Sequence, residues 1–287
     1  MSMSLIFPYL EFIRYYLRSG NAHDLHSPYV YDLYTRAIRP HRSKGLFRLN
    51  HSSERENEGK VYHHEGREIM WGEVLQKRLL ASEESIEVID LGGGSKHTPG
   101  VTREIKKIAR WSGRRSGAGR LLYRLTSYIQ PDWILELGTS LGIGTLYLHQ
   151  ASPNTPLTTI EGSSSVAEVA KKNLKEFKRI DVINSSFDRF FEERWSAPEG
   201  SGLIMVDGDH QYQSVKRYFD YLTKELNADT VILFDDIHWS EGMQRAWREI
   251  CMDEKARVTI DLYTFGIVFF KKELSRQHFI LWNKDCF

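Results

Sequence analysis

The sequence predicts an α/β protein built on a Rossmann-like, doubly wound sheet of seven mainly parallel strands. Between residues 127 and 272, short β-rich runs alternate with amphipathic helical runs, which is typical of a parallel sheet covered by helices on both faces. The last two β-rich runs are separated only by 264–266, which is too short for a parallel crossover, so they predict a terminal antiparallel hairpin. With 287 residues, the chain is long enough to bury a substantial core.

Seven β-rich runs define the expected strands. The first, second, fourth and fifth are followed by helical runs, such as Val166, Val169, Ala170 and Leu174 after the second strand. Ligands of such sheets bind at the carboxyl ends of the parallel strands, so we expect the functional residues there. The expected strands cover 133–137, 157–160, 181–184, 203–206, 230–234, 258–263 and 267–270.

The first 126 residues differ from the rest in their pattern of apolar residues, which is helical and irregular and does not alternate between β-rich and helical runs. We predict that residues 1–126 form a mostly helical cap or accessory region and that 127–287 form the sheet domain. Residues 50–60 are polar and predict a linker. We expect the helical region to cover the carboxyl ends of the strands, where a cap would determine which substrate is accepted. The aromatic residues within 5–17 and 29–34 predict helix packing or a homodimer contact, and the sequence leaves both open.

Composition limits the classes of partner. The formal net charge is +1, so no overall field favours nucleic acid or a membrane. The basic run at 103–120 predicts a solvated face, with nucleic-acid binding as the alternative.

The cysteines and the N-terminus bear on where the protein is located. Cys251 and Cys286 have neither zinc spacing nor a close pair, which favours a reducing cytoplasm. The N-terminal apolar run contains Pro8, Glu11 and Arg14 and lacks a signal-peptide pattern, so we expect it to pack on protein and not to span a membrane.

The segment 134–148 runs from the first expected strand through a glycine-rich turn into a helix. Gly138 allows a tight turn, while Gly142 and Gly144 let a ligand approach the backbone and the start of the next helix. The next strand ends at Glu161, whose two carboxylate oxygens can accept both hydroxyls of a ribose. Glu136 stands before the first glycine, where it would repel a pyrophosphate but suit the cationic aminoacyl end of S-adenosylmethionine (SAM).

The run ILELGTSLGIGT resembles the first motif of class I SAM-dependent methyltransferases, and especially that of the catechol O-methyltransferase type. The resemblance covers about half of the chain and excludes the first 120 residues. It implies that the methionine part of SAM is surrounded by residues of the turn, that Glu161 holds the ribose, and that Ser186 and Phe187 contact the adenine. The alternative is a Rossmann-like domain with another nucleotide or none. The turn residues implied are Glu136, Gly138, Ser140 and Gly144.

A second glycine-rich turn, at 90–95, has a similar pattern. It is followed by a basic helical stretch and a loop, and not by a strand with a terminal acid, so we predict a simple turn between strand and helix. The alternative is a loop that closes over the active site or holds an acidic substrate group with Lys96, His97 or Arg103.

Carboxylates follow two neighbouring expected strands: Asp207 and Asp209 after the fourth, and Asp235 and Asp236 after the fifth. Adjacent strands lie about 5 Å apart, so Asp207, Asp235 and Asp236 can converge and would repel unless a cation lay among them. Oxygen ligands favour Mg²⁺, Mn²⁺ or Ca²⁺. The segment is similar to metal-dependent O-methyltransferases, which implies that these three aspartates bind the ion. The Asp-Asp pair departs from the Asp-Asn found in that family.

His210 stands three residues after Asp207 and is the candidate general base. A histidine is the side chain that most often accepts a proton in catalysis and can take one from a hydroxyl, with Asp207 beside it as the other catalytic residue. A structural histidine is the alternative reading. His238 is a weaker candidate of the same kind, and Tyr212 and Trp239 either line a substrate pocket or pack in the core.

The leading hypothesis is a cytoplasmic SAM-dependent methyltransferase that methylates a hydroxyl of a small-molecule acceptor with the aid of a divalent cation. The first alternative is a metal-independent enzyme acting on nitrogen or RNA, although no N-P-P-Y-like base-binding motif is present. The second alternative is a protein that binds SAM or a nucleotide without turnover.

Overall fold

The structure is a computed structural model that describes residues 3–39, 63–64, 67–88, 102–111 and 116–284. The polar stretch at 50–60 and the glycine-rich turn at 90–95 lie outside the described residues, so what the sequence predicts for them stays a prediction. In the described part of the chain, no helix combines the length and the apolar character needed to cross a membrane.

The described part of the N-terminal region is mostly helical. Ser27 caps its second α-helix, because its hydroxyl accepts from the Val30 amide at 3.4 Å and Pro28 occupies the first helical position. The elements are α1 (Met3–Arg18), η1 (Ala22–Asp24), α2 (Pro28–Leu33), η2 (Tyr34–Ile38), β1 (His63–His64), β2 (Arg67–Glu68), α3 (Trp71–Leu80), β3 (Ser85–Glu87), β4 (Thr102–Glu104), α4 (Ile105–Trp111) and α5 (Ser116–Ile129).

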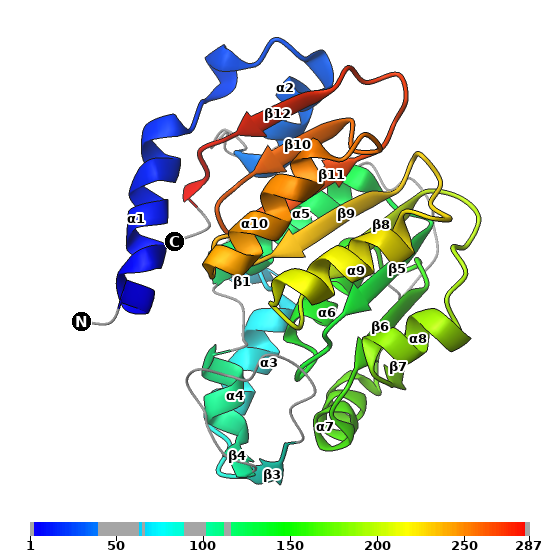
Figure 1. The fold of residues 1–287 in the computed structure, drawn as a ribbon. Coiled ribbons are helices and arrows are strands. Elements are labelled where there is room, and N and C mark those ends of the chain that lie inside the picture. Colours follow the sequence, from blue (N-terminus) through cyan, green and yellow to red (C-terminus); the bar gives the residue numbers. More distant parts are fainter. Residues whose placement is uncertain (1–2, 40–62, 65–66, 89–101, 112–115, 285–287) are drawn as a thin grey trace.

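From residue 133 onward, strands and helices alternate along the chain (Figure 1). The short connections between them place each helix against one face of the sheet. The elements are β5 (Trp133–Leu137), α6 (Ile143–Ala151), β6 (Leu157–Glu161), α7 (Ser164–Leu174), β7 (Ile180–Asn184), α8 (Phe187–Glu193), β8 (Gly202–Val206), α9 (Tyr212–Leu222), β9 (Val231–Asp235), α10 (Glu241–Met252), β10 (Val258–Asp261), β11 (Phe265–Phe269) and β12 (Gln277–Ile280).

The central sheet has the order β12-β10-β11-β9-β8-β5-β6-β7. Strands β7, β6, β5, β8 and β9 are parallel neighbours, so their carboxyl ends share one edge. The predicted hairpin is confirmed, because β10 and β11 pair antiparallel from Val258↔Phe269 to Asp261↔Gly266. The chain order reverses between β5 and β8, which is the kind of position where doubly wound sheets bind ligands.

Within the described residues the central sheet has eight strands, whereas the sequence predicts seven. The additional strand is β12, which pairs parallel to β10 from Val258↔Gln277 to Asp261↔Ile280. It lies at the edge of the sheet and begins with Gln277 and His278, so it lacks the buried apolar run by which the other strands are recognised. Only pairing with β10 makes this segment a strand.

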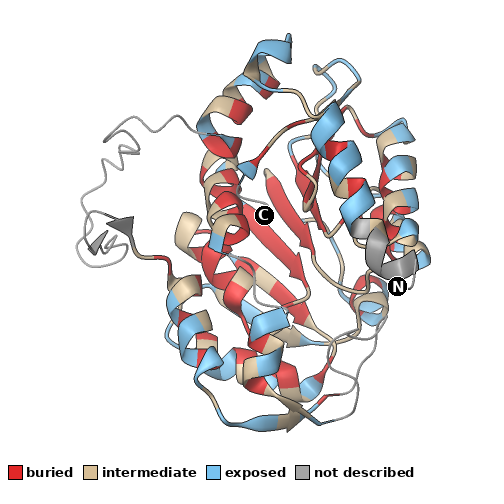
Figure 2. Ribbon diagram, turned by 90° about the vertical axis from the view of Figure 1, so that its left-hand side faces the viewer, coloured by how far each residue is buried: buried red, intermediate tan, exposed pale blue. Residues whose placement is uncertain are grey.

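Two hydrophobic clusters, one on each face, hold the sheet between layers of helices. Successive strand residues point to opposite faces, so Leu203 and Met205 belong to one cluster while Ile204 and Val206 belong to the other. Helices α8, α9 and α10 cover the second face, and α5 and α6 cover the first. Figure 2 shows the buried strands between helices whose outer sides are exposed.

The N-terminal elements pack directly on the sheet. Leu33 of α2 and Leu125 of α5 belong to the same cluster as Met205 of β8, and α5 crosses the predicted boundary at 126/127. By contrast, α1 lies beside the carboxyl ends of β10 and β12 (Figure 1), where Phe12 contacts the Tyr263 ring at 5.5 Å. Thus α1 lies at the strand edge that the sequence predicts to be capped, whereas α2 and α5 cover a face of the sheet.

Candidate active site

A tight turn after β5 forms the base of the site. Gly138 has φ +107°, and a β-carbon at this position would lie 1.9 Å from the carbonyl oxygen of Asp207. The Asp207 amide also donates to the Leu137 carbonyl at 2.8 Å. The absence of a side chain on Gly138 therefore allows the chains after β5 and β8 to approach, which places Asp207 beside the turn.

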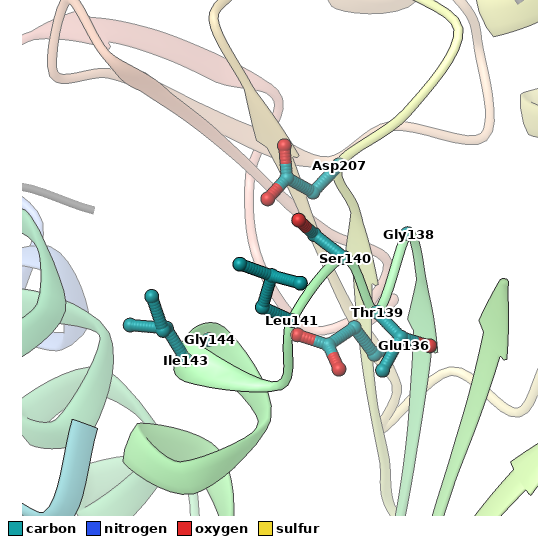
Figure 3. A pocket seen from close by; sticks show the side chains of 8 residues that line it. All are labelled: Glu136, Gly138, Thr139, Ser140, Leu141, Ile143, Gly144 and Asp207. Atoms are coloured by element: carbon teal, nitrogen blue, oxygen red, sulfur yellow. The ribbon is translucent and has the colours of Figure 1, made fainter. Parts of the chain in front are cut away.

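The turn leads into α6 and encloses a small pocket. Ser140 has φ +48°, and Gly142, the N-cap of α6, has φ +87°. Because the first amide groups of a helix have no partner within it, this arrangement places the positive end of α6 at the pocket. Figure 3 shows the residues that line the pocket, namely Glu136, Gly138, Thr139, Ser140, Leu141, Ile143, Gly144 and Asp207.

Glu136 is a buried carboxylate in the wall of this pocket. It is 1 % exposed, and its Oε2 accepts from the hydroxyl of Thr145 at 2.6 Å and from that of Thr159 at 2.7 Å. Thr145 lies on α6 and Thr159 on β6, so the acid is held from two elements. A carboxylate this deeply buried is stabilised by a positive charge beside it, which makes the pocket suited to a cation such as an ammonium group.

Glu161 lies at the carboxyl end of β6 and connects the glycine-rich turn to the next loop. Its Oε2 accepts from the Ser140 amide at 2.9 Å, and its Oε1 accepts from the Ser163 amide at 3.0 Å. The turn and this acid therefore belong to one site.

Ser186 and Phe187 begin α8, after β7. The Ser186 hydroxyl caps the helix by accepting from the Arg189 amide at 3.3 Å. The Phe187 ring packs over Gly208, where an added β-carbon would lie 2.7 Å from the ring. Both residues thus lie near the loop that follows β8, although neither lines the pocket around Glu136.

The three aspartates predicted to bind a metal do not form a ligand group. In the part of the chain that the structure describes, no set of three His, Cys, Asp or Glu residues is arranged to hold an ion. Asp207 lines the pocket, whereas Asp235 is 8 % exposed at the end of β9, and Asp236 has φ +54°. The three residues follow the ends of the neighbouring strands β8 and β9, but the described residues contain no group of three arranged as ligands. Binding of a divalent cation by these aspartates therefore stays a prediction.

His210 follows β8 and His238 follows β9, at the edge where the parallel strands end. The His210 Nε2 lies 3.9 Å from Asp207 Oδ1, and both side chains are partly exposed. His238 is held more tightly, since its Nε2 lies 2.8 Å from Oδ2 of the buried Asp261 and its ring stacks on Tyr263 at 5.2 Å. Burial raises the Tyr263 pKa to about 12, with a further contribution from Asp236, so the phenol stays protonated at neutral pH.

The sequence analysis did not identify three residues that hold side chains at this edge in place, namely Thr145, Thr159 and Asp261. Thr159 could have been found, because a hydroxyl side chain inside a buried strand needs a hydrogen-bond partner. Asp261 has no such signal, since its partner is 23 residues away in the chain. The structure also shows Tyr212 donating to Glu249 at 2.8 Å, which makes it a contact between α9 and α10.

The pocket lies within a segment of the chain that matches a known protein family. Residues 135–237 match the family described as a methyltransferase domain. An uncharacterized protein of Acanthamoeba polyphaga mimivirus is 27% identical over 119 residues, which are 40% of this chain and 50% of that protein. The chain therefore spans about half the length of the curated relative it matches.

Solved structures with a similar arrangement share little sequence identity with this chain. A methyltransferase from Geobacter sulfurreducens has 15% identity and a TM-score of 0.49, over 58% of this chain and 87% of that chain. An O-methyltransferase from Bacillus cereus in complex with SAH has 19% identity and a TM-score of 0.44, over 54% of this chain and 80% of that chain. The O-methyltransferase TomG from Streptomyces achromogenes, in complex with SAM, has 19% identity and a TM-score of 0.47, over 55% and 81% respectively.

Proposed function

We propose that the protein transfers a methyl group from SAM to a hydroxyl group of a small molecule, because residues 135–237 match the family described as a methyltransferase domain and lie on a doubly wound sheet. The observation that carries the proposal is the position of Glu136. Its buried carboxylate lies under the glycine-rich turn, clamped by two threonine hydroxyls. A pyrophosphate would be repelled from such a place, whereas the ammonium group of SAM would be attracted.

The cofactor residues predicted from the sequence are proposed to act together. The hydrogen bond from Ser140 to Glu161 supports this, because it joins the turn that would hold the methionine part to the acid that would hold the ribose. Phe187 and Ser186, at the start of α8, are proposed for the adenine. The residues proposed for the methionine part are Glu136, Gly138, Ser140, Gly142 and Gly144.

The reaction needs an acceptor for one proton. SAM, when bound, supplies an electrophilic methyl group on a positively charged sulfur. The acceptor oxygen bonds to this carbon, the electron pair of the broken carbon–sulfur bond stays on the sulfur, and the hydroxyl proton must leave. We assign that proton to His210, with Asp207 positioned to stabilise the resulting imidazolium. Their separation of 3.9 Å exceeds a hydrogen bond and is expected to shorten when substrate binds.

No step is assigned to a divalent cation, since the described residues form no ligand group for one. The cation predicted from the sequence is tested by measuring turnover with EDTA and after addition of Mg²⁺. Loss and recovery of turnover would support it, and equal rates in both conditions would contradict it.

Calorimetry with S-adenosylhomocysteine (SAH) and with NADH tests the cofactor. We expect SAH to bind and NADH not to bind. For Glu136→Gln we expect SAH affinity to fall about tenfold to a hundredfold, because a contact to a charged group contributes about 1.5–3 kcal/mol. Glu168→Gln is the matched control, since Glu168 is an exposed acid on α7. Tighter binding of NADH than of SAH, or unchanged SAH affinity in Glu136→Gln, would refute the assignment.

Turnover tests the acceptor and the base. SAH formation is followed with hydroxyl and amine acceptors, and His210→Gln is compared with the exposed His23→Gln. We expect kcat of His210→Gln to fall about 10²–10⁴-fold with a hydroxyl acceptor. Unchanged kcat would exclude His210 as the base. Methylation of amines alone would favour the nitrogen-directed alternative, and SAH binding without turnover on any acceptor would favour a binding protein.

A further inference from the structure

Helix α1 carries an apolar face that the rest of the described chain leaves exposed. Five of its side chains are large and hydrophobic, and each is between 50 % and 76 % exposed. At 3.6 residues per turn, the five lie within an arc of about 120° along one side of the helix. A contiguous apolar patch of this kind marks an interaction surface, whereas exposed apolar residues that are scattered singly do not. The residues of this face are Tyr9, Leu10, Ile13, Tyr16 and Leu17.

The opposite side of α1 is fixed to the protein. Tyr15 is buried, and its hydroxyl donates to the Leu281 carbonyl. Glu11 is also buried and accepts from the Gln244 side chain of α10. Rotation of the helix would break these buried hydrogen bonds, so α1 cannot turn its apolar face inward. Figure 1 shows α1 at the outside of the molecule, where an extended surface can reach it.

The charge beside the apolar face is positive. Arg14 and Arg18 are exposed and follow the face along one edge of the helix. Glu11 is the only acid within residues 3–18, and it is buried and paired with Arg14, so α1 exposes no carboxylate. A face that is apolar in the middle and cationic along its edge complements an apolar layer bordered by anionic groups.

A second copy of the chain complements this face less well. In a two-fold interface the same patch meets itself, so Arg14 and Arg18 of both copies would come together with no exposed acid on α1 to pair with them. A stable protein interface also involves about 20–30 residues from each partner, which is far more than one helix face supplies. A lipid surface has neither requirement, because its apolar layer is continuous and its phosphate groups are anionic.

We propose that α1 docks the protein on a membrane surface that contains anionic phospholipids. The helix lies in the plane of the interface, with its aliphatic side chains among the acyl chains and the phenol groups of its two exposed tyrosines at the level of the headgroups. The two arginines contact lipid phosphates. The carboxyl edge of β10 then faces the membrane, since α1 lies beside it. The inference does not rest on the proposed function, because no residue of α1 lines the pocket around Glu136.

The test uses the whole chain, without SAM, and vesicles of two compositions. One is phosphatidylcholine alone, and the other is an equal mixture of phosphatidylcholine and phosphatidylglycerol. Binding is measured by sedimentation of the vesicles. We expect the mixed vesicles to bind the protein at least about fivefold more tightly, since one arginine near an anionic surface contributes about that factor. High salt should remove this difference, because it screens exposed charges.

A double variant tests the apolar face. For Ile13→Gln with Leu17→Gln we expect binding to the mixed vesicles to weaken at least about tenfold, because two apolar side chains no longer enter the lipid. The matched control is Val74→Gln with Met252→Gln, since these residues are 56 % and 66 % exposed on other helices. We expect the control to bind as the wild type does.

A single variant tests the charge. For Arg18→Gln we expect binding to weaken about fivefold with the mixed vesicles and to stay unchanged with phosphatidylcholine alone. Lys172→Gln is the control, because Lys172 is an exposed cation on α7. Equal weakening by the two substitutions would mean that overall charge, and not α1, attracts the protein, which contradicts the proposal.

Further results would also overturn the proposal. These are absence of binding to the mixed vesicles, equal binding of the wild type to both compositions, and equal weakening by the two double variants. Sedimentation velocity without vesicles tests the second copy: a dimer that Ile13→Gln with Leu17→Gln converts to a monomer would show that another chain covers the face. Circular dichroism shows whether each variant is folded.

Discussion

Replacing Gly138 with alanine tests the close approach between the chains after β5 and β8. The added β-carbon would lie 1.9 Å from the Asp207 carbonyl oxygen, and 2.8 Å from its carbonyl carbon. These are backbone atoms, so no side chain can move aside to relieve the clash. In addition, the φ of +107° disfavours any residue with a β-carbon.

The expected loss of stability is large. Holding a residue other than glycine in such a backbone conformation costs about 1–3 kcal/mol, and overpacking a close contact costs about another 1–3 kcal/mol. Together these give about 2–6 kcal/mol, compared with a total unfolding free energy of about 5–15 kcal/mol for typical proteins. We therefore expect Gly138→Ala to unfold at a much lower urea concentration than the wild type, and to bind SAH poorly.

Two further glycines provide a graded comparison. At Gly142 the backbone is also left-handed, but the nearest atoms belong to the Leu174 side chain at 3.1 Å and can move, so about 1–3 kcal/mol is expected for Gly142→Ala. At Gly242, inside α10, the nearest atom is at 3.5 Å, and alanine should stabilise the helix by about 0.5–1 kcal/mol. Urea unfolding followed by tryptophan fluorescence measures all three. A loss below about 1 kcal/mol for Gly138→Ala, or equal losses at the three positions, would refute the reasoning.

Two other predictions concern buried polar groups. Burial lowers the pKa of His149 below its usual 6.5, so the unfolded chain binds more protons below that pH and stability should fall as the pH decreases from 6.5. His149→Phe should lose less stability than the wild type between pH 7.5 and pH 5.5 in urea unfolding, and equal losses would contradict this. Asp261 accepts from His238 and from the Tyr263 amide, so Asp261→Asn should lower the unfolding free energy by about 1–3 kcal/mol. A double-mutant cycle with His238→Gln should be non-additive, and strict additivity would argue against direct coupling.

The pattern of consecutive residues was sufficient to predict most strands of the sheet. Strands β5 to β11 were predicted within a few residues, because each is a short apolar run next to turn residues. The hairpin followed from the length of its connection, and Glu136, Gly138 and Asp207 were predicted at the pocket because the carboxyl ends of parallel strands meet at one edge. Strand β12 was missed, since an edge strand beginning with polar residues has no apolar run of its own.

Other features depend on contacts between distant parts of the chain. The clamp on Glu136 joins residues of β5, α6 and β6, and its hydroxyl donors are not distinguished in sequence from other threonines. Likewise, the pairing of His238 with Asp261 needs β10 to lie two strands away from β9. The metal site was predicted from the same-edge argument, which places strand ends together but does not determine where each carboxylate points.

The sequence by itself determined most of the segments that form the sheet and where its carboxyl edge carries acids, and it predicted that the glycine-rich turn and Glu161 lie together, as their hydrogen bond shows. These properties depend on the chemistry of consecutive residues, which is visible without coordinates. Only the tertiary structure decided which side chains meet in the described part of the chain: that α2 and α5 cover a face of the sheet, that two threonines donate to the buried Glu136, and that His238 pairs with Asp261. Side-chain direction and burial are set by packing between elements far apart in the chain, and local sequence does not encode them.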